Sequence, residues 1–379
     1  MCSMIYREIG KNREKVSAVG FGTGYHRPSD RGCSTLERSI NSALDHGVNF
    51  IDTAPVYGDG LSETVLGGIL KDLNRPKIFL ASKVSPEDTT YSGVLKSVED
   101  SLTRLQTDYL DLCQIHWPST TVPLEDTTRA LEKLVVDGKV RNIGVSNFML
   151  SEIKDTINAL EDNPLASIQT EYNFFERSIE KKLLPFCTKR DILLISYSPL
   201  SQGNMVNGER QRNLLDEIAQ KYNATPGQIV LRWLINHSNV VVIPNTSKPH
   251  RAIENANAAN ISLLPEDIEL LSHEMKTSIE LVDTKDIRVS NDYSRKVYQT
   301  VEEAIENKMN MSPTPLELAE EMKKGNFLKP IRLKELEHKK ENKSYDLVEG
   351  RLRYWAWVIA NGWDKPIPSL TWKTGRQND

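Results

Sequence analysis

The stretch NFIDTAPVYGDGLSETVLGGIL, residues 49–70, reads as one strand, one turn and one helix in succession. It opens with a short apolar run that suits a buried strand, and proline and glycine then mark a turn. Ser62 is expected to cap the helix, in which apolar residues recur every three to four positions. By themselves, Asp52 at the strand end and Tyr57 just beyond it are ordinary residues of a strand that runs into a turn. The remainder of the chain decides whether they have a further role.

Strand-like and helix-like segments alternate from about residue 15 to residue 275. The strand-like segments are short, apolar and rich in β-branched residues, and they cover residues 16–23, 49–55, 77–84, 109–118, 140–148, 166–174, 192–200 and 240–248. Eight strands that alternate with helices over about 260 residues match the number and size of a (β/α)8 (TIM) barrel. A doubly wound sheet is the competitor, but it usually opens on a glycine-rich turn, and no GxGxxG occurs in this chain. The sequence therefore predicts an α/β fold of the barrel type.

The composition is that of a soluble globular protein, with 39% hydrophobic and 26% charged residues among 379. No apolar run is long enough to cross a bilayer, and the first residues lack a secretory core and cleavage site, so they read as the mature start. Four cysteines are scattered without a CxxC pair, which argues against a zinc site or a disulfide framework. A formal net charge of −4 gives no general attraction to nucleic acid or to an anionic membrane. We therefore expect a cytoplasmic protein without a metal.

Four polar side chains stand at or just after the ends of neighbouring predicted strands. The second strand ends in Asp52 with Tyr57 in the loop after it, the third ends in Lys83, and the fourth ends in His116. In a (β/α)8 barrel the carboxyl ends of the strands meet at one mouth, where active sites of this fold lie. A lysine ammonium makes a nearby phenol a better acid, an aspartate keeps that lysine charged, and a histidine can polarise a carbonyl. Each residue alone reads as a structural one, but together they predict reduction of a C=O bond with Tyr57 as the acid.

Two motifs carry a resemblance to a known family. The pattern GxxxIDTAxxYG is present in GVNFIDTAPVYGDGLSETVLG, residues 47–67, and GxxRxiGvSNf in GKVRNIGVSNF, residues 138–148. Residues 5–275 thereby resemble an aldo-keto reductase. The resemblance implies a barrel that binds a nicotinamide cofactor without a Rossmann fold. It also implies an enzyme that reduces the carbonyl of a small metabolite or sugar-like substrate, or oxidises the alcohol. The family's catalytic residues fall on Asp52, Tyr57, Lys83 and His116.

The same resemblance implies a set of cofactor-binding residues. They are Gly22, Thr23, Ser146, Asn147, Gln169, Tyr197, Ser198, Pro199, Leu200, Thr246, Lys248, Arg251, Glu254 and Asn255. Asn245 and Thr246 stand where many NADPH-preferring members carry lysine and serine, and Lys248 is expected to supply the cation. Arg251 suits a 2′-phosphate, so the resemblance implies NADP, and NAD stays open. Trp117, Tyr25 and Phe148 are candidate walls of the substrate pocket or plain packing residues.

The alternation ends near residue 276, which predicts two domains, residues 1–276 and 277–379. Four of the six tryptophans follow residue 350, so this tail is expected to fold around them. Three segments, residues 279–296, 318–336 and 345–362, resemble the ParB/sulfiredoxin-like domain, a small α+β fold. The last of them, YDLVEGRLRYWAWVIANG, resembles its GxxR box, although Arg351 replaces the glutamate that usually follows the glycine.

This second resemblance implies a nucleotide site at Arg295, Glu349, Gly350 and Arg353, where a helix N-terminus and an arginine would favour phosphate. A module that only docks a partner or dimerises is the alternative. From Thr277 onward 18 Lys and Arg face 17 Asp and Glu, so DNA binding is not expected. Two other functions stay open for the whole chain. One is a regulatory protein that senses nicotinamide nucleotide, and the other adds small-molecule kinase activity in the tail.

Overall fold

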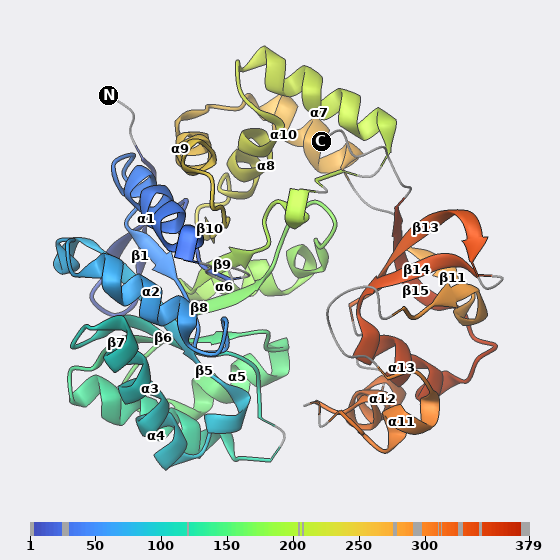
Figure 1. Ribbon diagram of the computed structural model, residues 1–379, viewed down its shortest axis with the longest axis horizontal. Helices are drawn as coiled ribbons and strands as arrows, with labels where there is room; N and C mark the ends of the chain where they lie inside the picture. The colour runs from blue at the N-terminus through green and yellow to red at the C-terminus, as the bar shows by residue number, and fades with distance from the viewer. Residues whose placement is uncertain are drawn as a thin grey trace. The chain divides into compact units, whose positions relative to one another are not determined.

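The computed structural model describes residues 4–24, 30–119, 121–203, 205–206, 208–275, 279–290, 298–309, 311, 313–324, 329–340 and 343–372. It divides into two compact units (Figure 1). The first comprises Met1–Met205 and Leu214–Glu274, and the second comprises Val206–Asn213 and Met275–Asp379. No helix in the described part of the chain is both long and apolar enough to cross a membrane.

The first unit is built on an eight-stranded parallel sheet within the described residues. Its strands are β3 (Phe21–Gly22), β4 (Phe50–Asp52), β5 (Phe79–Val84), β6 (Leu110–Ile115), β7 (Val140–Ser146), β8 (Leu165–Glu171), β9 (Leu193–Tyr197) and β10 (Val240–Val242). Each strand pairs with its neighbour in chain order, from β3 to β10. The sheet closes because Val19 bridges Val242 and the Gly20 amide donates to the Val242 carbonyl at 2.7 Å. The predicted barrel is confirmed.

Helices follow the strands and surround this sheet (Figure 1). They are α1 (Asp30–Leu44), α2 (Leu61–Leu70), α3 (Tyr91–Leu105), α4 (Leu124–Val136), α5 (Leu150–Ala159), α6 (Leu183–Arg190), α7 (Glu209–Lys221), α8 (Pro226–Leu234), α9 (Pro249–Asn257) and α10 (Pro265–Glu274). The prediction that Ser62 caps α2 is wrong. Gly60 is the capping residue, with φ 86°, and the Ser62 hydroxyl donates to the Thr23 hydroxyl at 2.9 Å instead. The Ser62 hydroxyl therefore bonds a residue distant in sequence and not a backbone amide at the start of its own helix.

An N-terminal hairpin lies at the amino ends of the barrel strands. Its strands are β1 (Tyr6–Ile9) and β2 (Glu14–Ser17), which pair antiparallel. Ile9 and Val16 join one buried cluster with residues from the starts of barrel strands, such as Phe50 and Phe79. Because the hairpin covers the amino ends, the carboxyl ends of the strands are the side left for a functional site.

The second unit is an α+β fold with its own core. Its mixed sheet has the order β11 (Glu280–Val282), β15 (Ile367–Trp372), β13 (Ile331–Lys340), β14 (Lys343–Glu349), β12 (Ile287–Arg288). Its helices are α11 (Val301–Ile305), α12 (Pro315–Lys323) and α13 (Arg351–Asn361). Tyr354 and Trp355 of α13 are 2% exposed and pack with sheet residues such as Leu333 and Leu347. The stretch is therefore folded, although among its described tryptophan side chains only Trp355 is buried and Trp363 is 39% exposed.

Candidate active site

The four predicted catalytic residues come from three neighbouring elements of the barrel. Asp52 is the last residue of β4, Lys83 is the penultimate residue of β5, and His116 directly follows β6. Tyr57 lies in the turn between β4 and α2, and its backbone amide donates to the Ala54 carbonyl at 3.1 Å. Parallel strands paired in register end at the same edge of the sheet, so all four residues lie at the carboxyl-end mouth.

Lys83 is the centre of the group. The whole residue is 2% exposed, and its ammonium donates to Asp52 Oδ1 at 2.7 Å and to the Thr53 carbonyl at 2.9 Å. It also donates to the Tyr57 hydroxyl at 3.4 Å. Burial alone would lower the pKa of Lys83, but the charges of Asp52 and Tyr57 and their hydrogen bonds outweigh burial and raise it above its usual value. The lysine is therefore held as a cation beside the phenol.

His116 also lies beside the phenol of Tyr57. The rings of Tyr57 and His116 meet edge to face with 6.0 Å between centroids, and Trp117 stacks on the imidazole at 3.7 Å. Burial, and then the charge of Lys83, lower the pKa of His116 to about 2. Its Nδ1 atom is buried and makes no hydrogen bond within the described residues. The ring is therefore neutral at physiological pH and can act as a hydrogen-bonding group.

The second oxygen of Asp52 is held by two glutamines. Gln169 of β8 donates to Oδ2 at 2.7 Å, and Gln114 of β6 donates to the same atom at 3.4 Å. Gln169 is among the predicted residues, but Gln114 is not. The signal for Gln114 was its place two residues before His116, which directs both side chains to the same face as the chain leaves β6. Protein donors therefore hold the carboxylate at both of its oxygens.

The predicted nicotinamide-binding residues lie along the same mouth. Ser146 ends β7 and Tyr197 ends β9, and Asn147 between them has a left-handed backbone with φ 63°. The Asn147 amide donates to the His116 carbonyl at 3.0 Å and accepts from the Tyr197 hydroxyl at 2.8 Å. Thr23, after β3, donates from its hydroxyl to the Asp52 carbonyl at 3.1 Å. Asn147 therefore connects the half-buried Tyr197 ring to the backbone of His116.

The predicted phosphate-binding residues occupy two segments beyond strands β9 and β10. Ser198 and Ser201, which flank Pro199 and Leu200, both have left-handed backbones, and the Ser201 hydroxyl is buried with no partner among the described residues. Such a hydroxyl and the loop around it fit a ligand with acceptor oxygens.

The start of helix α9 carries the predicted cations. Lys248 is the exposed residue that precedes the helix, and its backbone amide donates to the Thr246 hydroxyl at 3.1 Å. Arg251 lies in the first turn and pairs with Glu254 at 2.6 Å, while Asn255 lies one residue further along. A helix N-terminus with two cations favours a phosphate group. These residues fit a phosphorylated dinucleotide.

The candidate pocket walls differ in exposure. Trp117 is 36% exposed and stacks on His116, so it borders the site. Phe148 is only 6% exposed and belongs to the packed interior. Tyr25 lies outside the described residues.

The predicted nucleotide site of the second unit is only partly described. Gly350 precedes α13 with φ 96°, a conformation that favours glycine, and Arg295 lies outside the described residues. The Arg353 guanidinium donates to the carbonyls of Lys329 and Pro330, each at 2.8 Å. It also contacts Glu349 at 3.4 Å. Arg353 therefore ties α13 to the start of β13 within the protein.

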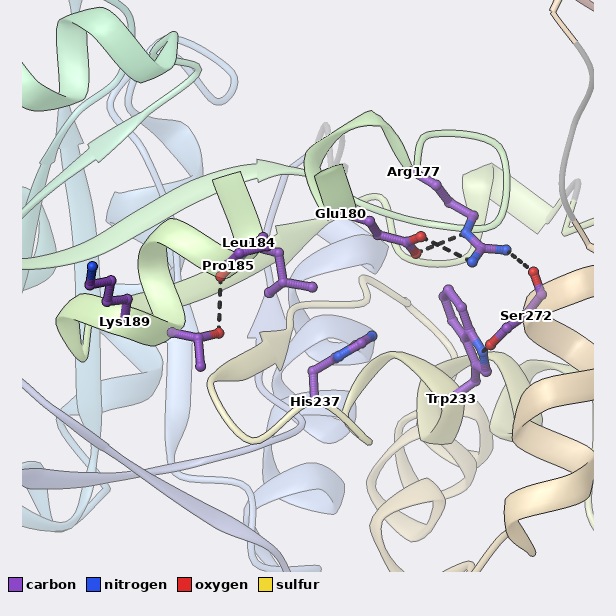
Figure 2. Close-up of a pocket in the computed structure, with 9 residues that line it drawn as sticks. Arg177, Glu180, Leu184, Pro185, Lys189, Trp233, His237 and Ser272 are labelled. Carbon is purple, nitrogen blue, oxygen red and sulfur yellow. Dashed lines mark hydrogen bonds and ion pairs between the residues drawn. The ribbon is translucent and has the colours of Figure 1, made fainter. Parts of the chain in front are cut away.

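A separate pocket of about 610 Å³ lies on the outside of the barrel (Figure 2). Its lining residues are Arg177, Glu180, Leu184, Pro185, Thr188, Lys189, Trp233, His237 and Ser272. Arg177 pairs with Glu180 at 2.8 Å and donates to the Ser272 carbonyl at 2.7 Å. None of the four predicted catalytic residues lines this pocket. Arg177 and Glu180 pair with each other, and none of the predicted site residues lies there, so the pocket is not assigned to the reaction.

Comparisons with known proteins match the first unit. The aldo/keto reductase family model matches residues 19–273. The chain is 39% identical over 264 residues to glyoxal reductase of Bacillus subtilis (strain 168), which covers 69% of this chain and 91% of the relative. It is 34% identical over 273 residues to methylglyoxal reductase YeaE of Escherichia coli (strain K12), which covers 70% of this chain and 95% of the relative. A solved aldo/keto reductase of Klebsiella pneumoniae, in complex with NADP and acetate, superposes with a TM-score of 0.66 at 32% identity, covering 71% of this chain and 95% of that one.

Proposed function

The chain belongs to the aldo/keto reductase family, and on that premise we propose that it reduces small reactive aldehydes and ketones with NADPH. The observation that carries the proposal is the buried Lys83 ammonium, which bonds Asp52 at 2.7 Å and the Tyr57 hydroxyl at 3.4 Å. Burying a cation costs free energy even when it is paired, so a buried lysine beside a phenol at the mouth of the barrel points to a functional site.

Tyr57 is the proton donor in this proposal. When bound, the nicotinamide supplies the hydride that goes to the carbonyl carbon. The carbonyl oxygen then gains negative charge and takes the proton of the Tyr57 hydroxyl, which the Lys83 cation makes a stronger acid. The neutral His116 ring donates a hydrogen bond to the same oxygen and thereby orients it and stabilises its charge. Asp52 holds Lys83 in place and keeps it charged.

Several residues at the mouth are proposed to hold the dinucleotide. Ser146, Asn147 and Gln169 would bind the carboxamide and Tyr197 would stack on the nicotinamide ring, since all four lie at or near strand ends around the catalytic group. The loop after β9 and the start of α9 would take the phosphates. The cofactor is NADP, which solved relatives hold. Lys248 supports the choice of NADPH over NADH, because it supplies a cation at the start of α9 although Asn245 replaces the usual lysine.

The substrate class is proposed from the relatives and from the site. The two curated relatives reported above act on glyoxal and methylglyoxal by name, and both are small two-carbonyl compounds. Trp117 offers an exposed aromatic face beside His116, against which a small planar carbonyl compound can lie. Glyoxal, methylglyoxal and related short aldehydes are therefore the first substrates to test.

The direct test is NADPH oxidation by the purified full chain with glyoxal, methylglyoxal and a panel of sugars and ketones. We expect turnover with the two-carbonyl compounds, and Tyr57→Phe should lower kcat by roughly 10²- to 10⁴-fold while NADPH still binds. Cofactor binding without turnover on any carbonyl would contradict the proposal and favour the nucleotide-sensing function. Turnover that survives Tyr57→Phe would contradict the assigned acid.

For the second unit we propose a ParB/sulfiredoxin-like domain that begins near residue 277 and acts by docking a partner. Support for the domain type comes from the order of its motifs and from Gly350 at the start of α13. Docking is favoured over nucleotide binding or kinase chemistry because Arg353 is already bonded to two carbonyls and Glu349. Thermal unfolding of the full chain with ADP, CDP and GDP tests this choice. No shift is expected, and a shift that Gly350→Val or Arg353→Ala abolishes would restore the nucleotide site.

A further inference from the structure

One layer of the barrel interior is made of an acid and two amides. Asp52 of β4, Gln114 of β6 and Gln169 of β8 come from alternate strands, which is how interior layers of such barrels are formed. All three side chains are at most 1% exposed. The two amides converge on Oδ2 of Asp52, while Lys83 occupies Oδ1. The layer therefore forms the floor beneath the Lys83–Tyr57 pair.

A buried carboxylate needs a donor for each of its oxygens. Asp52 is only 1% exposed, so its oxygens depend on donors from the protein interior. Lys83 can satisfy only the oxygen it faces. Without amide donors on Oδ2, the carboxylate would lose stabilisation of its charged form and could rotate away from the ammonium.

Gln114 carries a cost that packing does not explain. Its Oε1 atom is buried and accepts no hydrogen bond among the described residues, and an apolar side chain would avoid that penalty. Leu112, two residues earlier on the same inward face, shows that β6 accommodates an apolar residue in this interior. The amide nitrogen of Gln114 donates to one side chain within the described residues, that of Asp52. We therefore attribute the presence of Gln114, despite its unsatisfied Oε1 atom, to the hydrogen bond that its Nε2 atom donates to Asp52.

The two glutamines differ in what else they face. Gln169 makes the shorter bond to Asp52, 2.7 Å against 3.4 Å, but it is also a proposed ligand of the nicotinamide carboxamide. Gln114 has no proposed contact with the cofactor. Its effect on the reaction would have to pass through Asp52.

We propose that Gln114 is a positioning residue for the reduction, which holds the Asp52 carboxylate so that Lys83 stays directed at Tyr57. This inference rests on the proposed reductase function. Gln114 lies outside the four proposed catalytic side chains. Its loss should slow proton delivery from Tyr57 and leave cofactor binding unchanged.

The test replaces Gln114 by methionine, which keeps the length of the side chain and removes the amide. With NADPH and methylglyoxal, Gln114→Met is expected to lower kcat and kcat/KM together by about tenfold, the scale of one hydrogen bond to a charged group. The dissociation constant of NADPH, measured by fluorescence, should change by less than about twofold, because ground-state binding is untouched. Leu112→Met is the matched control, since it places the same side chain on the same inward face and should leave kcat within about twofold.

A double-variant cycle shows whether Gln114 acts through Asp52. In an Asp52→Ala background, Gln114→Met should cost no more than about twofold in the single-turnover rate, because the acceptor it serves is gone. An unchanged kcat in Gln114→Met, or a full tenfold loss in both backgrounds, would overturn the inference while the wild-type turnover still supports the reductase. Absence of wild-type turnover on every carbonyl would overturn the reductase function and this inference with it.

Discussion

At the scale of single residues, Lys83 is the one whose environment matters most. It is buried between Asp52 and Tyr57, and its charge both balances the carboxylate and acts on the phenol. Removing it should therefore have two separable effects, one on folding and one on rate.

Lys83→Met is expected to lower kcat by about 10²-fold or more, because Tyr57 loses the cation that makes it acidic. It should also destabilise the barrel by about 3–5 kcal/mol, because Asp52 is left as an unpaired buried charge. Adding Asp52→Asn removes that charge and should restore stability without restoring kcat. The measurements are steady-state kinetics and amide hydrogen exchange of β5. A double variant that recovers turnover would contradict the role of Lys83.

His116 allows a prediction about pH. Its pKa is lowered by burial and by Lys83 to about 2, whereas in the unfolded chain the ring has its ordinary pKa. The unfolded state then binds a proton below about pH 6.5 that the folded state does not take up, so stability falls as the pH is lowered. Between pH 7 and pH 5 this histidine should cost the barrel about 2 kcal/mol of stability.

The measurement compares the wild type with His116→Asn, which cannot titrate. Hydrogen exchange of β5 and β6 amides at pH 5 and pH 7 reports the stability of the barrel by itself, after correction for the intrinsic exchange rate. The wild type should lose more stability than the variant over this range. An equal loss in both would mean that His116 is protonated in the folded protein.

At the scale of elements, the close contact of α2 with α3 depends on one glycine. A Cβ atom at Gly67 would lie 2.2 Å from the Arg104 carbonyl oxygen and 2.8 Å from the Leu105 carbonyl carbon, both backbone atoms that cannot move easily. The next residue, Gly68, has nothing within 4 Å of the same position. Gly67 therefore has no room for a side chain, whereas Gly68 does.

Gly67→Ala should destabilise the barrel by about 1–3 kcal/mol through overpacking. Gly68→Ala should instead stabilise it by about 0.5–1 kcal/mol, because alanine is the better helix former at an exposed position. Denaturant unfolding of the two variants side by side gives the comparison. Equal effects would show that α2 and α3 are not in close backbone contact.

At the scale of the whole molecule, each unit has its own hydrophobic core. The core of the second unit is accompanied by a buried ion pair that joins its strands β12 and β14. Arg288 meets Asp346 through two hydrogen bonds, at 2.5 Å and 2.9 Å, and the side chains are 13% and 10% exposed. Disruption of the Arg288–Asp346 pair should therefore lower the stability of the second unit and leave that of the barrel unchanged.

Asp346→Ala is expected to destabilise the second unit by about 1.5–3 kcal/mol, because it removes the charge-assisted hydrogen bonds that Arg288 donates to Asp346 between β12 and β14. Hydrogen exchange of β13 and β14 should quicken while that of β5 and NADPH turnover stay as in the wild type. Asp364→Ala is the control, since it breaks an exposed ion pair with Lys285 and should leave both units unchanged. Lost turnover in Asp346→Ala would show that the barrel needs the second unit.

Where the sequence predictions were wrong or incomplete, the cause is a contact between residues far apart in the chain. Ser62 is of a residue type that often caps helices, but it lies within α2 and its hydroxyl donates to Thr23, which follows β3. Gln114 was missed because its partner is Asp52, 62 positions away in the chain. The mixed order of the second sheet, β11-β15-β13-β14-β12, joins strands far apart in sequence, and no local pattern encodes such pairing.

The sequence by itself determined the barrel and the positions of Asp52, Tyr57, Lys83 and His116, because strand periodicity and strand ends are local properties of the chain. Only the tertiary structure decided that Lys83 bonds both Asp52 and Tyr57, that His116 is neutral, and that two glutamines hold the second oxygen of Asp52. These features depend on which side chains exclude water from one another, and that is settled only when distant strands pack together.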